Sequence, residues 1–552
     1  MKKKFHQKNT CKRSIVFLLL VVLSFTGNAQ SLSEKIAATT MKTWPDTSKS
    51  VVTNASFNQG FLLEGLAAVW KRTANADYYR YIQKSIDKLV DQNGTIKSDT
   101  QENSNIDNIK IGCALLLLYR VSGQEKYYKA LNQLRGKLKN QYQKISINQT
   151  PPNDWFDFEP FAAEYAAVFD KPAAFDTIVN QFISSENLIT NPTTSKENSM
   201  GFYAMALVDA LEYFPENHPQ RKTLLAILNR IAAAFQFNQN LENGMLVYTL
   251  AKGMRLGYLP EKYKNSAKKG YDAMVKNEAA GNIKDPKNAG VFILTANEME
   301  LAEIPKTGKG QTVMLDSYFN NEFMKDVTGR TIPFHYKWNE MDNNGFYFFK
   351  NAFNYHGVKT ATLKAAPTVA NLKGSDIYII VDPDTQKETE KPNYVNEQDA
   401  TNVADWVKAG GVLVILANDA GNCDLEHLNI LAEKFGIHFN QDIHNKVIGP
   451  QIKLGTLQVP VTDPIFKTAK KIYLKDISTF KLNPPAVASF TDEKAVLIAT
   501  AKYGKGMVFA VGDPWFYDEY TDGRNLPAGY DNFKACNDLV NWLIKQVPAK
   551  IK

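Results

Sequence analysis

Two stretches of the chain decide its interpretation: DWFDFEPFAAEYA at residues 154–166 and MGFYAMALVDAL at residues 200–211. Each begins with acidic or aromatic residues and continues as an apolar run with helical spacing. The same spacing recurs from residue 31 to about residue 280, interrupted by short Gly, Pro or Asn turns. We therefore predict an all-helical domain here, with helices near 57–69, 78–89, 106–119, 125–138, 158–169, 173–183, 200–213, 220–235, 244–256 and 261–275.

An internal repeat indicates how these helices are organised. The sequence WKRTANADYY at 70–79 recurs as YRVSGQEKYY at 119–128, which is an offset of 49 residues, and a fainter echo begins at Phe169. A period near 50 residues is typical of a two-helix hairpin repeat. Such hairpins bury their apolar faces only by stacking on one another. A closed (α/α)-barrel and an open solenoid both satisfy this requirement.

The pattern changes after residues 281–310, which hold Gly and Pro residues and which we interpret as a linker. Short apolar runs then alternate with helical patterns, as in a mostly parallel, open α/β sheet. The expected fold class is thus an N-terminal domain of stacked helical hairpins at 30–280, either a barrel or a solenoid, followed by an α/β domain at 311–552. The apolar runs that we expect to be strands are 313–316, 377–381, 412–416, 495–499 and 507–511.

The first 29 residues have the features of a signal peptide. A basic start, an apolar run from Ile15 to Phe25 and small residues up to Ala29 follow one another, and the apolar run is short for a membrane span. We therefore expect an exported protein, periplasmic or secreted, cleaved near Ala29 and not inserted in a membrane. Removing six basic and no acidic residues would leave 59 basic against 57 acidic residues. This near-neutral balance gives no support to a nucleic-acid partner.

Five stretches of the helical domain together resemble one family of carbohydrate-active enzymes. They are 57–66, 105–109, 159–165, 201–211 and 248–259, and they include NQGFLLEG, NIDNI and EPFAAEY. In this order they resemble the unsaturated glucuronyl and rhamnogalacturonyl hydrolases of glycoside hydrolase families 88 and 105. The resemblance implies a helical-barrel enzyme that removes a terminal unsaturated uronic acid from oligosaccharides left by a polysaccharide lyase, as from pectin or rhamnogalacturonan.

The implied reaction is hydration of the C4=C5 double bond of the terminal sugar. An acid protonates one end of the vinyl ether while a base activates the water that adds at the other end. The resemblance assigns these roles to two aspartates, Asp107 and Asp157. Each of them could instead cap the helix that follows it.

Four further residues are candidates for binding the substrate. Trp155 and Phe158 could stack on sugar rings, or they could close the top of the barrel. Phe202 keeps an aromatic position of the family pattern, whereas Asn198 stands where the resemblance expects an arginine. An amide does not reproduce the bidentate fork of a guanidinium group, so a copy with this change could bind oligosaccharides or a partner enzyme without catalysis. A helical scaffold with no role in sugar binding is the third alternative.

The α/β domain carries a second resemblance. Residues 503–517, YGKGMVFAVGDPWFY, are similar to the last strand and loop of glutamine-amidotransferase-like domains. Cys423 lacks the glycine spacing of a nucleophile elbow, so we do not expect it to be catalytic. No metal or nucleotide motif is visible, and hydration of a vinyl ether needs no cofactor. The oligomeric state, the sugar and its linkage, and the role of the α/β domain stay open.

Overall fold

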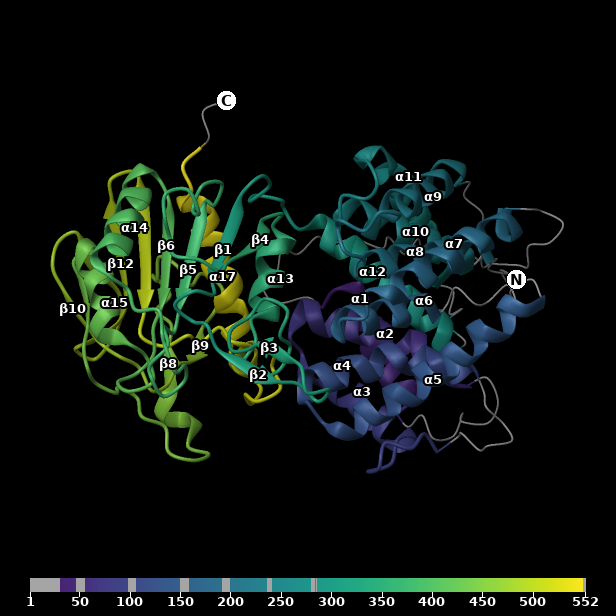
Figure 1. Cartoon of the computed structure of the whole chain (residues 1–552), viewed down its shortest axis with the longest axis horizontal. Helices are drawn as coiled ribbons and strands as arrows, with labels where there is room; N and C mark the ends of the chain where they lie inside the picture. The colour runs from purple at the N-terminus through teal and green to yellow at the C-terminus, as the bar shows by residue number, and fades with distance from the viewer. Residues whose placement is uncertain are drawn as a thin grey trace, which may run out of the picture.

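The protein is described by a computed structural model that covers residues 30–45, 55–97, 106–148, 158–190, 199–235, 241–278, 283 and 285–549. Within these residues the chain forms a helical domain and an α/β domain, which lie side by side along the long axis of the molecule (Figure 1). None of the described helices combines the length and apolarity needed to cross a bilayer.

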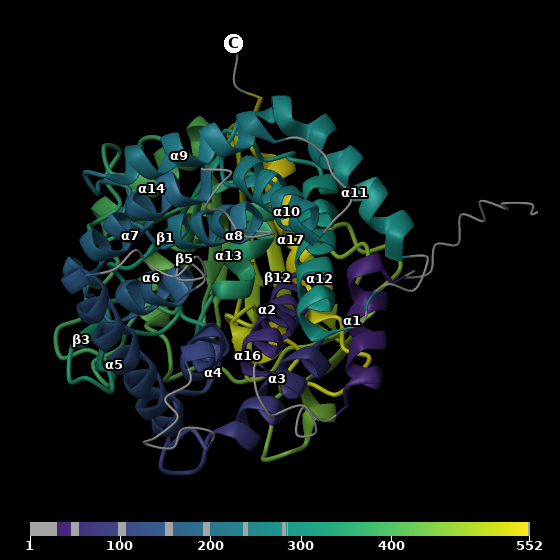
Figure 2. The same cartoon turned by 90° about the vertical axis from the view of Figure 1, so that its right-hand side faces the viewer.

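Six helices form a closed inner ring. Each helix of the ring packs against the next one along the chain, and the last packs against the first, so that the ring surrounds a central axis (Figure 2). This closure decides between the two alternatives left by the repeat: the helical domain is an (α/α)-barrel and not a solenoid. The inner helices are α2 (Ala55–Thr73), α4 (Gly112–Ser122), α6 (Glu159–Val168), α8 (Ser199–Leu211), α10 (Leu241–Arg255) and α12 (Pro286–Glu303).

An outer helix precedes or follows each inner helix along the chain and covers the outside of the ring. In α3, for example, Tyr78, Ile82 and Ile86 are buried while the opposite face carries charged residues, which is the amphipathic pattern of a covering helix. The outer helices are α1 (Leu32–Thr43), α3 (Ala76–Leu89), α5 (Glu125–Asn148), α7 (Ala173–Thr190), α9 (Arg221–Ala234) and α11 (Lys264–Glu278), with short 3₁₀ segments η2 (Ile106–Ile111) and η4 (Glu261–Tyr263).

The sequence repeat corresponds to the turns from inner to outer helices. Trp70 at the end of α2 contacts Tyr79 of α3, with ring centroids 5.0 Å apart. The equivalent pair one repeat later, Tyr119 and Tyr128, is 5.9 Å apart across the turn from α4 to α5. The repeated aromatic residues therefore pack each inner helix against the outer helix that follows it, in the same way in both hairpins.

The predicted linker at 281–310 is wrong in its central part, because α12 occupies 286–303 and closes the ring. Asp285 caps this helix through the backbone N–H of Asn288, and Pro286 stands at its first turn. The helix is buried on almost all sides, so it lacks the one-sided apolar pattern by which its neighbours were predicted. The connection between the domains is the short stretch from Ile304 to Gln311.

The α/β domain is built on a seven-stranded sheet with the order β11-β12-β13-β6-β5-β1-β4. The five strands from β13 to β4 are parallel, and β12 and β11 add an antiparallel edge. This confirms the predicted mostly parallel sheet. The strands of the sheet are β1 (Thr312–Asp316), β4 (Lys359–Leu363), β5 (Ile377–Val381), β6 (Val412–Leu416), β11 (Ala486–Asp492), β12 (Ala495–Tyr503) and β13 (Gly506–Val511).

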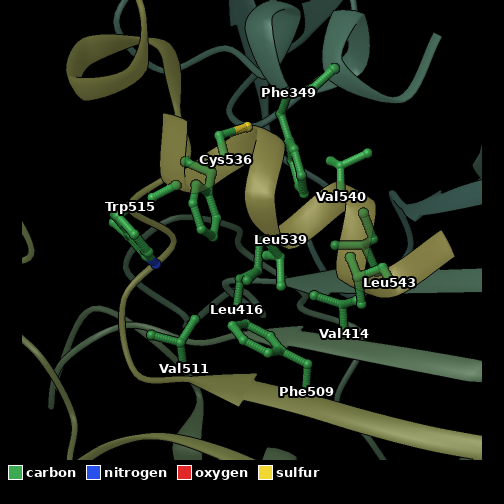
Figure 3. Close-up of a cluster of buried hydrophobic side chains, with 14 of the residues drawn as sticks. Phe349, Val414, Leu416, Phe509, Val511, Trp515, Cys536, Leu539, Val540 and Leu543 are labelled. Atoms are coloured by element: carbon green, nitrogen blue, oxygen red, sulfur yellow. The ribbon is translucent and has the colours of Figure 1, made fainter. Parts of the chain in front are cut away.

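Helices cover both faces of this sheet. Alternate residues of β6, such as Val414 and Leu416, pack against α13 (Tyr347–Tyr355) and α17 (Asn532–Gln546), as Figure 3 shows for Leu539 and Leu543. Leu413 and Ile415 point to the other face, under α14 (Glu397–Ala409) and α15 (Leu425–Ala432). Burial of both faces explains the continuous apolar runs of the strands. Smaller elements are β2 (Phe323–Lys325), β3 (Thr331–Pro333), β7 (Ile437–Phe439), β8 (Thr456–Gln458), β9 (Lys471–Tyr473), β10 (Phe480–Leu482), η5 (Glu433–Phe435), η6 (Ile452–Gly455) and α16 (Asp518–Thr521).

The two domains are joined by buried contacts as well as by the chain. The indole N–H of Trp70 donates to the carbonyl of Asp522 over 2.9 Å, and its ring lies 5.0 Å from that of Phe348 in α13. Arg120 of α4 donates to the carbonyl of Asn339, and Arg330 of the β2–β3 hairpin donates to the carbonyl of Val168. These contacts hold the α/β domain against one end of the barrel.

Candidate active site

The α/β domain closes one end of the barrel. Three residues of α13, Tyr347, Asn351 and Tyr355, line a cavity of about 170 Å³. The cavity is also lined by the C-terminal parts of α2 and α10, at Lys71 and Arg255, and by the first turns of α4 and α6, at Cys113 and Pro160. The view along the barrel shows α13 behind the centre of the ring (Figure 2). The N-terminal ends of the inner helices therefore face away from the α/β domain, and we call this end, which the α/β domain does not cover, the open end of the barrel.

The cavity at the closed end is filled with paired charges. Lys252 lies 2.7 Å from Asp209 and 2.8 Å from Glu212, and Arg255 makes two bonds of 2.7 and 2.8 Å to Glu298. Burial opposes ionisation of Glu212, but Lys252 and Arg255 outweigh it and lower the pKa of Glu212 to about 2. These ion pairs tie α8, α10 and α12 together, and Glu212, which its partners hold ionised, is poorly suited to proton transfer near neutral pH.

At the open end, η2 brings the family motif around Asp107 against α2. Asp107 is the second residue of η2, and Lys110 of the same turn lies 3.1 Å from Glu64 and 4.0 Å from the centre of the Phe61 ring. Burial raises the pKa of Glu64, and Lys110 opposes this shift. The motif NQGFLLEG of α2 and the turn containing Asp107 thus form one packed unit.

Phe202 joins this unit from α8. Its ring centroid lies 5.7 Å from that of Phe61, and the ammonium group of Lys287, at the start of α12, lies 4.3 Å from the Phe202 ring. Three inner helices and η2 therefore bring two aromatic rings and two lysines together. The sequence did not predict a role in the site for either lysine. Lys110 follows the motif at 105–109 and is not part of it, and Lys287 lies in the stretch that was interpreted as a linker.

The other predicted site residues divide into two groups. Asp157, Trp155 and Asn198 lie outside the described residues. Phe158 is 4 % exposed and packs in the core of the barrel, so its ring offers no face to a sugar in this structure. The alternative role of Asp107 as a helix cap stays a prediction, since the residue lies within η2, before α4 begins at Gly112.

Glu159 is a buried acid at the open end of the barrel, where α6 begins. It is the first residue of α6, it is 0 % exposed, and its Oε1 accepts a hydrogen bond of 2.8 Å from the hydroxyl of Tyr142. Among the described residues its Oε2 has no hydrogen-bond partner. Burial raises the pKa of Glu159 to about 8, against the smaller effect of Tyr142. The carboxyl group is therefore protonated at neutral pH.

The raised pKa of Glu159 predicts a measurable dependence of stability on pH. The unfolded chain releases this proton near pH 4.5 and the folded chain only near pH 8, so stability falls as pH rises between these values. Glu159→Gln should remove this loss, and its melting temperature relative to the wild type should rise steadily from pH 5 to pH 8. A difference that stays constant over this range would show that Glu159 ionises normally in the folded protein.

Cys423, the thiol of the α/β domain considered from the sequence, does not have the surroundings of a reactive nucleophile. Cys423 is buried, and burial raises the pKa of its thiol well above the usual range. It lies in the loop between β6 and α15, next to the cap residue Asp424. That Cys423 is not catalytic stays a prediction. In the described part of the chain, no group of three or more His, Cys, Asp or Glu residues is arranged to hold a metal ion.

Comparison with known families agrees with the geometry of the barrel. Residues 32–196 and 240–291 match the family model described as Glycosyl Hydrolase Family 88, and both segments lie in the helical domain up to the first turns of α12. The helical domain resembles glycoside hydrolase family 88. The family 88 match contains Asp107 and Asp157, and it omits Phe202 and the α/β domain.

Several solved structures are similar to part of the chain. A family 105 glycoside hydrolase of Clostridium acetobutylicum is 26% identical, with a TM-score of 0.41, over 49% of this chain and 99% of its own. A family 88 glycosyl hydrolase of Bacteroides vulgatus is 13% identical, with a TM-score of 0.38, over 48% of this chain and 98% of its own. A possible family 105 member of Salmonella enterica is 14% identical, with a TM-score of 0.37, over 44% of this chain and 82% of its own.

Proposed function

We propose that this protein is an exported hydrolase that removes a terminal unsaturated uronic acid from lyase-generated oligosaccharides, with pectin or rhamnogalacturonan fragments as the substrate class. The observation that carries the proposal is that the family 88 match contains Asp107, which stands in the 3₁₀ turn η2 that leads into the inner helix α4 at the open end of a closed barrel. In this mechanism Asp107 and Asp157 share the acid and base roles in hydration of the C4=C5 bond. The resulting hemiketal collapses and the glycosidic bond is lost.

The electrostatics of the open end are favourable for an acidic sugar. Each inner helix presents its N-terminus there, and helix N-termini carry positive partial charge. Lys287 adds a full positive charge next to Phe202. In a chain where asparagine stands at position 198 in place of the family's arginine, Lys287 is the described cation best placed to bind the uronate carboxylate.

A substitution of Lys287 tests this assignment. Lys287→Ala should raise the KM for an unsaturated uronyl disaccharide by roughly tenfold to a hundredfold, because a hydrogen bond to a charged group contributes about 1.5–3 kcal/mol. The value of kcat should change little, since the carboxylate is bound in both the ground state and the transition state. Lys287→Arg should restore most of the affinity, and Lys276→Ala, on the exposed face of α11, is the matched control. An unchanged KM would remove Lys287 from the site.

The second candidate function is binding without catalysis. It is favoured by Asn198 and by the short run from Trp155 to Phe158, which departs from the longer segment that the family carries before Glu159. The assay that separates the two functions is the ultraviolet absorbance of the C4=C5 bond during incubation with unsaturated oligosaccharides. Loss of absorbance supports the enzyme, and saturable binding with constant absorbance supports the binding protein.

A further inference from the structure

A groove on the outer wall of the barrel shares no lining residue with the cavity at the closed end. It has a volume of about 440 Å³ and runs between α5, α6 and α7. Its floor is formed by aromatic and aliphatic side chains, among them Phe161, Tyr165, Leu138 and Ile178. The volume lies within the range of small-molecule pockets in proteins.

The rim of this groove is positively charged. Arg135, Lys139 and Lys171 line it, against a single acid, Asp170. Within the described residues none of these three cations forms an ion pair, although ion pairs are frequent elsewhere on the barrel. The guanidinium of Arg135 lies 5.4 Å from the centre of the Tyr165 ring, so charge and apolar surface are adjacent.

The groove offers few neutral groups that could bind hydroxyls. The hydroxyl of Tyr165 donates to Asn132 over 2.8 Å, and that of Tyr142 donates to Glu159 over 2.8 Å. Both tyrosines therefore present ring surface and not free donors. A sugar would leave its hydroxyls without partners on such a floor, which is unfavourable. A ligand with an apolar body and a negative head meets both the floor and the rim.

We propose that the groove between α5, α6 and α7 binds an apolar carboxylic acid, with the hydrocarbon body on the floor and the carboxylate between the rim cations. Such a ligand could be an aliphatic acid or an aromatic one, because the rings and the aliphatic side chains of the floor accommodate either body. The site is independent of the proposed hydrolysis, since none of its lining residues takes part in the reaction derived above.

The experiment is calorimetric titration of the full chain with laurate and with 2-naphthoate, and each acid has its neutral amide as a control. We expect saturable binding of at least one acid and weaker binding of its amide. Laurate alone would mark the groove as a site for aliphatic chains, and naphthoate alone as a site for aromatic acids. Absence of binding by both acids, or equal binding of acid and amide, would overturn the proposal.

Substitutions locate the binding. The double variant Lys139→Glu with Lys171→Glu should weaken the affinity at least about tenfold, because two attractions become repulsions. Lys222→Glu, on the exposed face of α9, is the matched control and should bind like the wild type. Ala174→Leu fills the groove from α7 and should abolish binding while thermal unfolding shows that the variant is folded. If the acids bind equally to all variants, or if saturated trigalacturonate binds more tightly than they do, the groove is not the predicted site.

Discussion

Asp107→Asn should lower the turnover of an unsaturated uronyl oligosaccharide by about a hundredfold to ten-thousandfold, which is the usual contribution of a general acid or base. Asparagine keeps the size of the side chain and much of its hydrogen bonding but cannot donate or accept the proton. Binding of the substrate should persist, because the cations and aromatic rings of the open end are unchanged. Turnover is followed by loss of the ultraviolet absorbance of the double bond, and binding is followed by calorimetry.

The controls for this variant separate catalysis from folding. Asp272→Asn, on the exposed outer face of α11, makes the same chemical change, loses only an exposed ion pair to Lys268 at 3.2 Å, and should leave activity intact. Asp157→Asn should resemble Asp107→Asn if the two aspartates act together. In a binding protein neither aspartate change would matter greatly, and Trp155→Ala would weaken binding more than either. A wild-type protein that neither binds nor converts any unsaturated uronyl oligosaccharide would leave only the scaffold alternative.

Gly290→Ala should destabilise the barrel more than any exposed substitution. A β-carbon at Gly290 would lie 2.3 Å from the backbone carbonyl of Phe61, so α12 and α2 would have to separate. Forcing atoms into a close-packed contact costs about 1–3 kcal/mol. Because this contact closes the ring, we expect a clear fall of the melting temperature and a loss of the activity or binding at the open end.

A second glycine provides the matched comparison. Gly136 lies on the exposed face of α5, and a β-carbon there would meet no atom within 4 Å. Gly136→Ala should therefore stabilise the protein by about 0.5–1 kcal/mol, through the lower conformational entropy of alanine in the unfolded chain. Thermal unfolding of both variants measures the difference. Equal effects of the two substitutions would mean that α12 is not packed against α2 as described.

The helices and strands with strong local patterns could be predicted from the sequence. The strands predicted at 377–381 and 412–416 agree with β5 and β6 in both bounds, because each is a short apolar run with polar or glycine residues close to both ends. The repeat at 70–79 and 119–128 correctly indicated helical hairpins. By contrast, α12 could not be recognised, since a helix buried on nearly all sides has no polar face to reveal its period.

The candidate site could be predicted only in part. Asp107 and Phe202 were identified through motifs, and they occur in η2 and α8 at the same end of the barrel. Lys287 and Glu159 could not have been assigned a role in the same way. The position of Lys287 near Phe202 depends on closure of the ring, and the raised pKa of Glu159 depends on its complete burial, which no local sequence pattern reports.

The sequence by itself determined the two domains, the hairpin repeat, the strands and the family resemblance, because these follow from residue spacing and from motifs read along the chain. Only the tertiary structure decided that the hairpins close into a ring, that α13 covers one end of it, and that Lys287 lies over Phe202. The physical reason is that ring closure depends on contacts between residues more than 200 positions apart, such as Gly290 with Phe61. Such contacts depend on how the surfaces of two whole helices fit together. They therefore produce no periodic pattern in the sequence of either helix.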